Sequence, residues 1–289
     1  MISAKVICDS ISPSGVRLTT LELQYHRFVH SEMMTHRMFS RNASSSRAIP
    51  VEKMIAAVRS SPAMPIHWGK NQAGMQAREE LPEIEIDVVK NDWNYASKRM
   101  TEIATLMSEM NLHKQIVNRI LEPFQWIKVI VTATEWDNFF KLRHHEDAQP
   151  EMMVLAEHMK KAMDESIPTE LHPGEWHLPY LSNDELGIAN PDECLEEAIK
   201  WSVARCARVS YLNHDKSFPD RDKDIALADM LLAAGHLSPF EHIATPMNFA
   251  KDTFELAWEN GVTHKDRDNN FWSGNFRGWI QHRQLLQAN

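Results

Sequence analysis

The chain has 289 residues, of which 43% are hydrophobic and 25% are charged, the composition of an ordinary globular protein. Its formal net charge of −9 argues against non-specific nucleic-acid binding, because such binding needs a broad basic face. At this length the chain can bury a large core, as one domain or as two.

The cysteines, Cys8, Cys194 and Cys206, are far apart in the sequence and form no CxxC pair. This spacing is typical of a reduced cytosolic chain without disulfides or a zinc ribbon. Residues 1–10 contain no long apolar run, and no stretch approaches the roughly 20 apolar residues of a membrane span. We therefore expect a cytoplasmic protein with no signal peptide, no membrane segment and no nucleic-acid partner.

The first part of the chain alternates between strand, helix and loop patterns. Residues 4–11 and 16–25 alternate in polarity and are rich in β-branched side chains, which predicts two strands joined by a turn. Helical spacing follows over residues 26–39, then a loop over 40–50, a short helix over 51–60 and another loop. Apolar side chains then recur every three or four residues from 86 to 110, which predicts a helix with one apolar face.

The second part is predicted to be mostly helical. The apolar pattern continues from residue 112 to 136, and a helix that ran through Pro123 would bend there. Further helices are predicted at 150–163, 192–211 and 222–236, with Gly235 as a C-terminal stop. Prolines between residues 167 and 191 indicate a loop, and residues 242–247 indicate a strand. The fold class predicted is α+β, helix-rich with a modest, mainly antiparallel sheet.

The stretch from residue 26 to residue 47 is basic although the chain as a whole is acidic. It contains several arginines and histidines but a single acidic residue, Glu32, and three consecutive serines lie near its end. A phosphate group needs several convergent donors, which arginine forks, serine hydroxyls and loop N–H groups supply. Arg37, Arg41, Ser45 and Arg47 therefore suit a nucleotide monophosphate. A solvated basic surface loop is the alternative.

Other polar residues lie in apolar surroundings. Arg119, Asn138 and Arg143 occur in strongly apolar segments, where such side chains are paired in the core or contact a ligand. GHLSPFEH, residues 235–242, forms a compact polar corner between a predicted helix and a predicted strand. The histidines of the basic stretch and the HHED run at 144–147 lack an HExxH pattern, so we expect no metal site. There is also no GxSxG, P-loop or dinucleotide-binding glycine pattern.

Together these segments resemble one known family. Residues 36–47, HRMFSRNASSSR, are similar to the RHRxxSxNExSxRY signature of the flavin-dependent thymidylate synthases, with Thr35 in place of the first arginine. GHLSPFEH resembles the family's GHxTPFEH segment, and ARCARVSY at 204–211 resembles its xRAARVSF segment. NRILEP and NFFKLRHHEDAQPEM resemble its ARIVLP and NFLNLRxxxxAQxEI segments. Separate matching segments make the resemblance specific.

The order of these segments is unusual. In the ordinary family the ARVS and GHxTPFEH segments precede the arginine-rich signature, whereas here they follow it, at residues 204–242. The chain thus resembles a circularly permuted relative with added material, and GWIQHRQLL at 278–286 is a faint echo of the family's QWFRHR. We expect a single catalytic domain over residues 1–289, with two lobes at about 1–166 and 192–289 joined by a proline-containing connection.

The resemblance implies a definite chemistry. Family members convert dUMP to dTMP with FAD as cofactor and with methylenetetrahydrofolate and NADPH as co-substrates. They are homotetramers that hold FAD between subunits, and they need no cysteine nucleophile. The chain is therefore expected to be a FAD-dependent thymidylate synthase, a methyltransferase of nucleotide biosynthesis with dUMP and folate as partners.

The resemblance also implies roles for individual residues. The family's arginine that assists ionisation at uracil N3 falls on Arg143, the expected catalytic residue. The expected substrate-binding positions are Glu32, Thr35, Ser44, Ser45, Ser46, Arg47, Arg119 and Arg143, with the phosphate at Ser45, Arg47 and Arg119. The expected flavin-binding positions are His36, Arg37, Asn138, His236 and Ser238.

Several positions depart from the family pattern. Thr35, Ala43 and Ala48 replace its arginine, glutamate and tyrosine, while Glu32, Ile116 and Asp147 replace a glutamine, an acid and a histidine. Loss of an arginine at position 35 removes one phosphate or flavin contact, for which Arg41 is a substitute. These departures keep three alternatives open: flavin-dependent C5 modification of a related pyrimidine nucleotide, such as hydroxymethylation, a nucleotide-binding relative without catalysis, and a histidine-cluster metallohydrolase.

Overall fold

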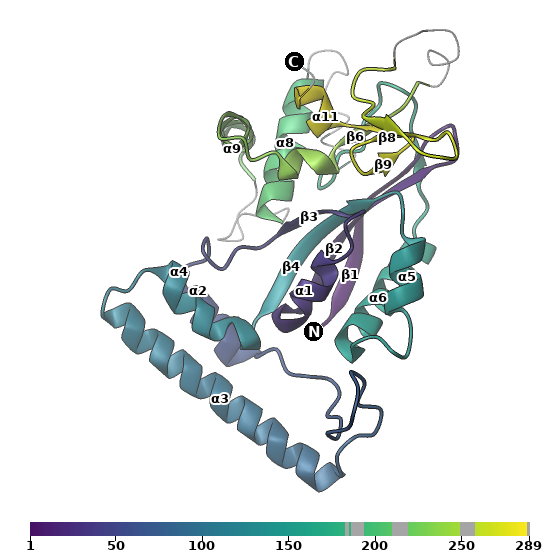
Figure 1. The fold of residues 1–289 in the computed structure, drawn as a ribbon. Helices are drawn as coiled ribbons and strands as arrows, with labels where there is room; N and C mark the ends of the chain where they lie inside the picture. The colour runs from purple at the N-terminus through teal and green to yellow at the C-terminus, as the bar shows by residue number, and fades with distance from the viewer. Residues whose placement is uncertain (183–184, 186–193, 210–218, 249–257, 288–289) are drawn as a thin grey trace.

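A five-stranded sheet of order β3-β4-β2-β1-β5 organises the chain (Figure 1). The computed structural model describes residues 1–182, 185, 194–209, 219–248 and 258–287. β1 (Ser3–Ile11), β2 (Arg17–His26), β4 (Trp126–Ala133) and β3 (Ser40–Ala43) pair antiparallel, and β5 (Thr169–Glu170) pairs parallel with β1. The predicted α+β class with a modest, mainly antiparallel sheet is confirmed.

Helices cover one face of this sheet. α1 (His30–Met34), α5 (Asp137–Arg143) and α6 (Pro150–Asp164) pack against β2 and β4 in the main apolar cluster. Because successive strand side chains point to opposite faces, Val129 and Val131 of β4 enter this cluster. Ile130 lies between them on the other face, where it packs against the C-terminal elements. β4 is therefore buried on both sides.

The C-terminal part of the chain covers that second face. Its helices are α8 (Leu195–Arg208), α9 (Arg221–Ala233), the 3-10 helix η3 (Ser238–His242) and α11 (His282–Gln287). β6 (Ala244–Pro246) pairs with β10 (Trp279–Gln281), and β7 (His264–Lys265), β8 (Phe271–Ser273) and β9 (Phe276–Arg277) form a small separate sheet. As predicted, α9 is followed by Gly235 at φ 71°. Residues 192, 193, 210 and 211 of the predicted helix at 192–211 lie outside the described residues.

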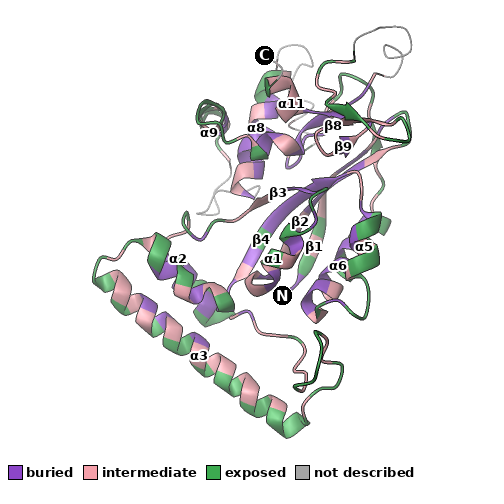
Figure 2. Cartoon of the chain, in the orientation of Figure 1, coloured by how far each residue is buried: buried purple, intermediate pink, exposed green. Residues whose placement is uncertain are grey.

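A helical arm projects from the end of the sheet at which β3 ends and β4 begins (Figure 1). It consists of α2 (Val51–Ser60), α3 (Glu83–Glu109), α4 (Lys114–Val117) and the 3-10 helix η2 (Asn118–Phe124). Trp93, Ala96, Met100 and Met107 of α3 pack with α2, which confirms the predicted apolar face. The outer side of α3 is largely exposed (Figure 2). In the part of the chain that the structure describes, no helix is long and apolar enough to cross a membrane.

Two predictions of secondary structure were wrong. Residues 26–39 are helical only in the 3-10 helix η1 (Arg27–Val29) and in α1, and the predicted loop at 40–50 begins with β3. The continued helix predicted over residues 112–136 is instead α4, η2 and the strand β4, with Pro123 inside η2. A strand that is buried on both faces has no alternation of polarity, so its apolar run was mistaken for a helix.

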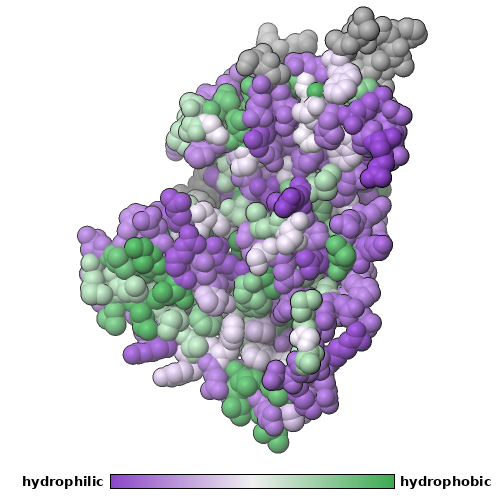
Figure 3. Space-filling view, in the orientation of Figure 1, coloured by the Kyte–Doolittle hydropathy of each residue, from purple (hydrophilic) through white to green (hydrophobic). Residues whose placement is uncertain are grey.

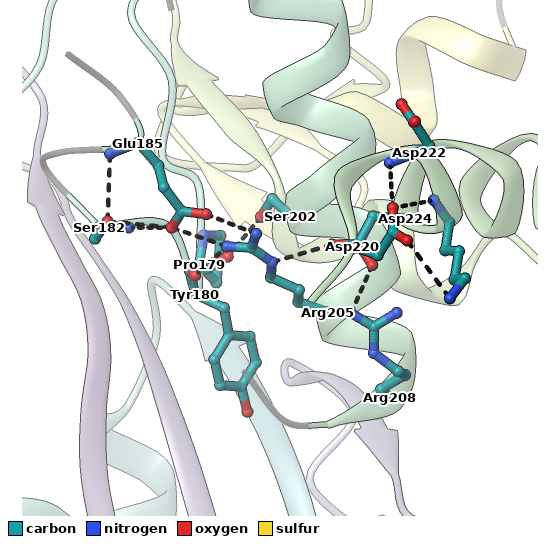
Figure 4. A network of polar contacts seen from close by, with 11 residues as sticks. Pro179, Tyr180, Ser182, Glu185, Ser202, Arg205, Arg208, Asp220, Asp222 and Asp224 are labelled. Carbon is teal, nitrogen blue, oxygen red and sulfur yellow. Dashed lines mark hydrogen bonds and ion pairs between the residues drawn. The ribbon is translucent and has the colours of Figure 1, made fainter. Parts of the chain in front are cut away.

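A buried ionic network holds the C-terminal helices together (Figure 4). Arg205 of α8 is 1% exposed; its guanidinium donates to Glu185 at 2.7 Å, to the Tyr180 carbonyl at 2.9 Å and to Asp224 of α9 at 3.2 Å. Arg208 pairs with the other oxygen of Asp224 at 2.7 Å. Burial raises the pKa of Glu185, but the hydrogen bonds from Arg205 outweigh this effect and hold that pKa below its usual value. The network therefore stabilises the fold at neutral pH and weakens in acid, as Glu185 takes up a proton.

We predict that Arg205→Met destabilises the protein by about 3–5 kcal/mol, because Glu185 loses the guanidinium that pairs with it and the buried Asp224 loses one of its two cations. Urea unfolding at pH 7 measures this change. Arg99→Met is the matched control, since Arg99 pairs with Glu102 on the exposed surface of α3 and such pairs contribute about 0–1 kcal/mol. Equal stabilities for the two variants would show that the network contributes nothing specific.

Candidate functional site

Arg143 is the centre of a polar cluster that joins α5 to α1. Its Nε donates to His36 Nε2 at 2.9 Å, its Nη1 to Glu32 Oε2 at 3.0 Å and its Nη2 to Thr35 Oγ1 at 3.3 Å. The Thr35 hydroxyl in turn donates to the Glu32 carbonyl at 2.7 Å. The structure thus brings Glu32, Thr35, His36 and Arg143 together, although more than a hundred residues separate Arg143 from the others.

His36 supports this cluster as a neutral ring. It is 8% exposed and packs edge-on against Phe139 at 4.9 Å between ring centroids. Burial, together with the charges of Arg143 and Arg41, lowers the pKa of His36 to about 4. Because Arg143 donates to Nε2, the single ring proton of neutral His36 lies on Nδ1. His36 therefore acts as an acceptor that orients Arg143.

A cleft of about 700 Å³ opens beside this cluster, which is a size suited to a small ligand. Its lining includes Glu32, His67, Arg78, Arg143 and Asp147. Arg78 pairs with Asp147 at 2.6 Å. Asp147, a departure from the family pattern, thus fastens the segment before α3 to the rim of the cleft.

The serine loop after β3 forms a second polar group. Ser44 exchanges hydrogen bonds with the backbone of Lys128 in β4. Ser46 donates to Glu122 at 3.0 Å, and the same carboxylate oxygen accepts from Arg119 at 2.8 Å and from Arg27 at 2.9 Å. Burial raises the pKa of Glu122. The opposing effects of Arg27, Ser46 and Arg119 are larger, so that pKa lies below its usual value. Glu122 was missed in the sequence, where its spacing three residues after Arg119 was the available signal.

Several predicted site residues are exposed and uncommitted. Ser45 accepts a bond from the backbone N–H of Arg47 at 3.3 Å. Within the described ranges no hydrogen bond or ion pair involves the side chains of Arg37, Arg47, Asn138 and His236, all of which are exposed. These side chains are therefore available to a ligand or a partner.

The Arg143 cluster and the serine loop are not joined within one chain. β3 separates them in the sequence, since His36 precedes this strand and Ser44 follows it. Among the described residues no hydrogen bond or ion pair connects the two groups, and the cleft is lined by neither Arg119 nor any residue of the serine loop. The predicted base-binding and phosphate-binding residues thus lie in different places on the chain.

Comparison with known proteins places these residues in a family. The family model described as thymidylate synthase complementing protein matches residues 16–169, just over half of the chain. The chain belongs to the thymidylate synthase complementing protein family. No curated protein matches it.

Solved structures similar to this chain include a methylase and a thymidylate synthase. The UMP/dUMP methylase PolB from Streptomyces cacaoi, bound with 5-Br UMP, is 16% identical over 57% of this chain and 89% of its own, with a TM-score of 0.49. Thymidylate Synthase X (ThyX) from Helicobacter pylori, with FAD and dUMP, is 15% identical over 50% of this chain and 67% of its own, with a TM-score of 0.38.

The family match contains both polar groups but ends before the segments at 204–242. The structure nevertheless packs η3 against the signature strand β3. Asn42 of β3 lies 3.2 Å from the Ser238 hydroxyl and 3.0 Å from His242 Nε2. Ser238, a predicted flavin-binding residue of this family, is therefore adjacent to the signature, whereas His236 points to no described partner.

A buried chain of hydrogen bonds runs from Asn42 across the sheet. His242 Nδ1 contacts Thr132 at 2.8 Å, Thr132 contacts Thr20 at 2.7 Å, Thr20 contacts His177 Nε2 at 2.7 Å, and His177 Nδ1 contacts Ser10 at 2.8 Å. These hydrogen bonds thus cross β4, β2 and β1 in turn. The sequence analysis did not predict them, because the residues that form them come from distant segments.

The hydrogen bonds between Asn42 and Ser10 all run in one direction from donor to acceptor. With its nitrogen toward His242, the Asn42 amide donates to His242 Nε2 and to the Ser238 carbonyl, and its oxygen accepts from the Ser238 hydroxyl. Burial lowers the pKa of both His177 and His242 to about 3, so each ring is neutral and has one N–H. His242 must then donate from Nδ1 to Thr132, and each later member donates onward to Ser10.

Acid weakens this arrangement. Both histidines have folded-state pKa values below the ordinary 6.5, so the unfolded chain binds protons more readily. Their contribution to the free energy of unfolding is therefore present near neutral pH and is lost as the pH falls from about 6.5 toward 3.

We predict that Thr132→Val lowers the free energy of unfolding by about 1–3 kcal/mol, because the buried N–H of His242 loses its acceptor. Urea unfolding at pH 7 measures the effect. Thr169→Val is the control on the exposed strand β5, where a change within about 0.5 kcal/mol is expected. A Thr132→Val protein as stable as the parent would show that this row of hydrogen bonds contributes nothing to stability.

Proposed function

We propose that this protein is a flavin-dependent enzyme that transfers a one-carbon unit to C5 of a pyrimidine nucleoside monophosphate. In the family that it resembles, this reaction is the reductive methylation of dUMP to dTMP with methylenetetrahydrofolate, FAD and NADPH. The main support is the Arg143 cluster, which combines a fixed guanidinium, a carboxylate and a neutral histidine beside a cleft of ligand size.

Arg143 is the proposed catalytic residue. Its side chain is 19% exposed, so its charge is partly withdrawn from water and acts on a bound ring more strongly than a surface charge would. Three of its N–H bonds are used to hold its position, by His36, Glu32 and Thr35. The remaining N–H groups can stabilise negative charge as it develops on the pyrimidine.

The exposed donors fit a flavin dinucleotide. Arg37, Asn138 and His236 have uncommitted polar atoms, and Ser238 lies next to the signature strand. A diphosphate and a polar ring system require donors of these kinds. FAD, when bound, would relay electrons from NADPH to the product. The chain's own residues would bind the flavin, orient it and present the nucleotide.

A second copy of the chain is proposed to complete the site. The cleft beside Arg143 lacks the serine loop, so a nucleotide whose base lies at Arg143 needs a phosphate site from elsewhere. Arg47, exposed and uncommitted, suits that role when it comes from a neighbouring subunit. A closed homo-oligomer, by resemblance a homotetramer, would give every cleft a serine loop.

The outer face of α3 supports self-association. It exposes Ile84, Val88, Tyr95, Leu106 and Met110, which lie within an arc of about 80° at 3.6 residues per turn. Figure 3 shows hydrophobic side chains gathered at both ends of this arm. A second apolar stripe, beside the one packed on α2, is expected to be covered in the assembled protein.

We predict that Arg143→Ala lowers kcat strongly and that Arg47→Ala chiefly raises KM. Removing a charge-assisted phosphate contact costs about 10- to 150-fold in affinity, whereas Arg143 acts on charge that develops during the reaction. The assay is release of tritium from C5-labelled dUMP and dCMP in the presence of FAD, NADPH and methylenetetrahydrofolate. Arg99→Ala is the surface control, and a parent protein that binds no FAD would remove the flavin proposal.

We also predict that the Arg143→Ala and Arg47→Ala variants complement each other at a nucleotide concentration below the raised KM of Arg47→Ala. If each site takes Arg143 from one subunit and Arg47 from another, random mixing at equal amounts restores about a quarter of the parental sites. The variants are unfolded together, refolded and assayed for tritium release. Activity no greater than the sum of the separately refolded variants would show that both arginines act within one chain.

A further inference from the structure

The Glu32–Arg143 pair leaves a specific set of hydrogen-bonding groups beside the cleft. Arg143 has five N–H bonds, and three of them go to His36, Glu32 and Thr35. Glu32 accepts through Oε2, while its Oε1 accepts no hydrogen bond among the described residues. Both side chains line the cleft. A ligand there therefore meets one carboxylate oxygen next to two guanidinium N–H groups.

This set is the complement of a cytosine edge. Cytosine presents an amino N–H donor at C4, followed by two acceptors, the unprotonated N3 and the carbonyl O2. Glu32 would accept from the amino group while the two free N–H groups of Arg143 donate to N3 and O2. All three protein groups are then paired, and the pairs are charge-assisted.

Uracil fits the same set less well. Its edge is acceptor, donor, acceptor, so a carboxylate next to O4 would repel it. In the other register Glu32 accepts from N3–H and Arg143 donates to O2, but then one of the three protein groups stays unpaired. A carboxylate that holds the N3 proton also opposes ionisation at N3, the step that an arginine alone would favour.

We infer that Glu32 makes this site selective for a 4-aminopyrimidine nucleotide, of the cytosine class, over a 4-oxopyrimidine nucleotide such as dUMP. The inference rests on the proposed function, because it assumes that the base of a pyrimidine nucleotide lies in this cleft. Glu32 is then the specificity-determining residue, and Arg143 supplies the donors to N3 and O2 of the preferred base.

The test measures binding of dCMP and dUMP by calorimetry to the FAD-loaded protein. The parent should bind dCMP at least about tenfold more tightly, the equivalent of one additional charge-assisted hydrogen bond. Glu32→Gln should reverse the order, because an amide can accept from uracil N3–H and donate to O4. Glu146→Gln removes the same charge from the same cleft without touching Arg143, and should keep the parental ratio.

A ligand series on the parent protein avoids dependence on one variant. The 2-pyrimidinone deoxynucleotide has the N3 and O2 acceptors of dCMP but no amino group, so it should bind about 10- to 150-fold more weakly than dCMP. Tighter binding of dUMP than of dCMP, equal binding of dCMP and the pyrimidinone, or an unchanged ratio in a folded Glu32→Gln protein overturns the inference alone. Binding of none of these nucleotides overturns the proposed function as well.

Discussion

The pairing of the short strand β3 with β4 is the constraint on which the rest of the site depends. Four residues, Ser40 to Ala43, are held opposite Thr132 to Val129. Alternation along β3 sends Arg41 toward α1, where it donates to the carbonyls of Met33 and His36. It sends Asn42 to the other face, toward His242 and Ser238. One strand thus fixes the cluster on one face of the sheet and the junction with η3 on the other.

Different kinds of interaction stabilise the two faces of the sheet. On the α1 face the side chains of Arg143 and Glu32 are partly exposed, at 19% and 32%, so they can exchange partners with a ligand. On the η3 face His177 and His242 are fully buried and neutral, and both ring nitrogens of each have a partner. A satisfied buried network is rigid, because breaking one member leaves an unpaired polar group. The sheet therefore offers an adaptable polar surface on one side and a fixed one on the other.

The sequence was sufficient for features that depend on local pattern. The strands at 4–11 and 16–25, the helix at 51–60, the apolar face of α3 and the stop at Gly235 follow from alternation, helical spacing and glycine conformation. It was insufficient where tertiary burial overrides pattern. β4 is apolar on both faces, and β3 contains Arg41 and Asn42, whose polarity suggested a loop.

The same division applies to the site. Motif resemblance brought Glu32, Thr35, His36 and Arg143 into one list, and the structure shows them in contact. Their hydrogen-bond assignments, the proton on His36 Nδ1 and the single free oxygen of Glu32 required coordinates. Glu122, Thr132 and His242 were missed because each acts through a partner distant in sequence or in an unrelated segment.

The order of segments in this chain is compatible with the fold because the C-terminal part has its own support. Arg205 links Glu185 and the Tyr180 carbonyl to α9, so α8 and α9 are held together by bonds within residues 180–224. The attachment to the sheet then uses side chains that need no particular chain order. The Tyr180 hydroxyl donates to Glu22 at 2.7 Å, and Gln281 donates to Ser40 at 3.1 Å. Since these contacts depend on position and not on connectivity, a segment that elsewhere precedes the signature can follow it and still pack η3 against β3.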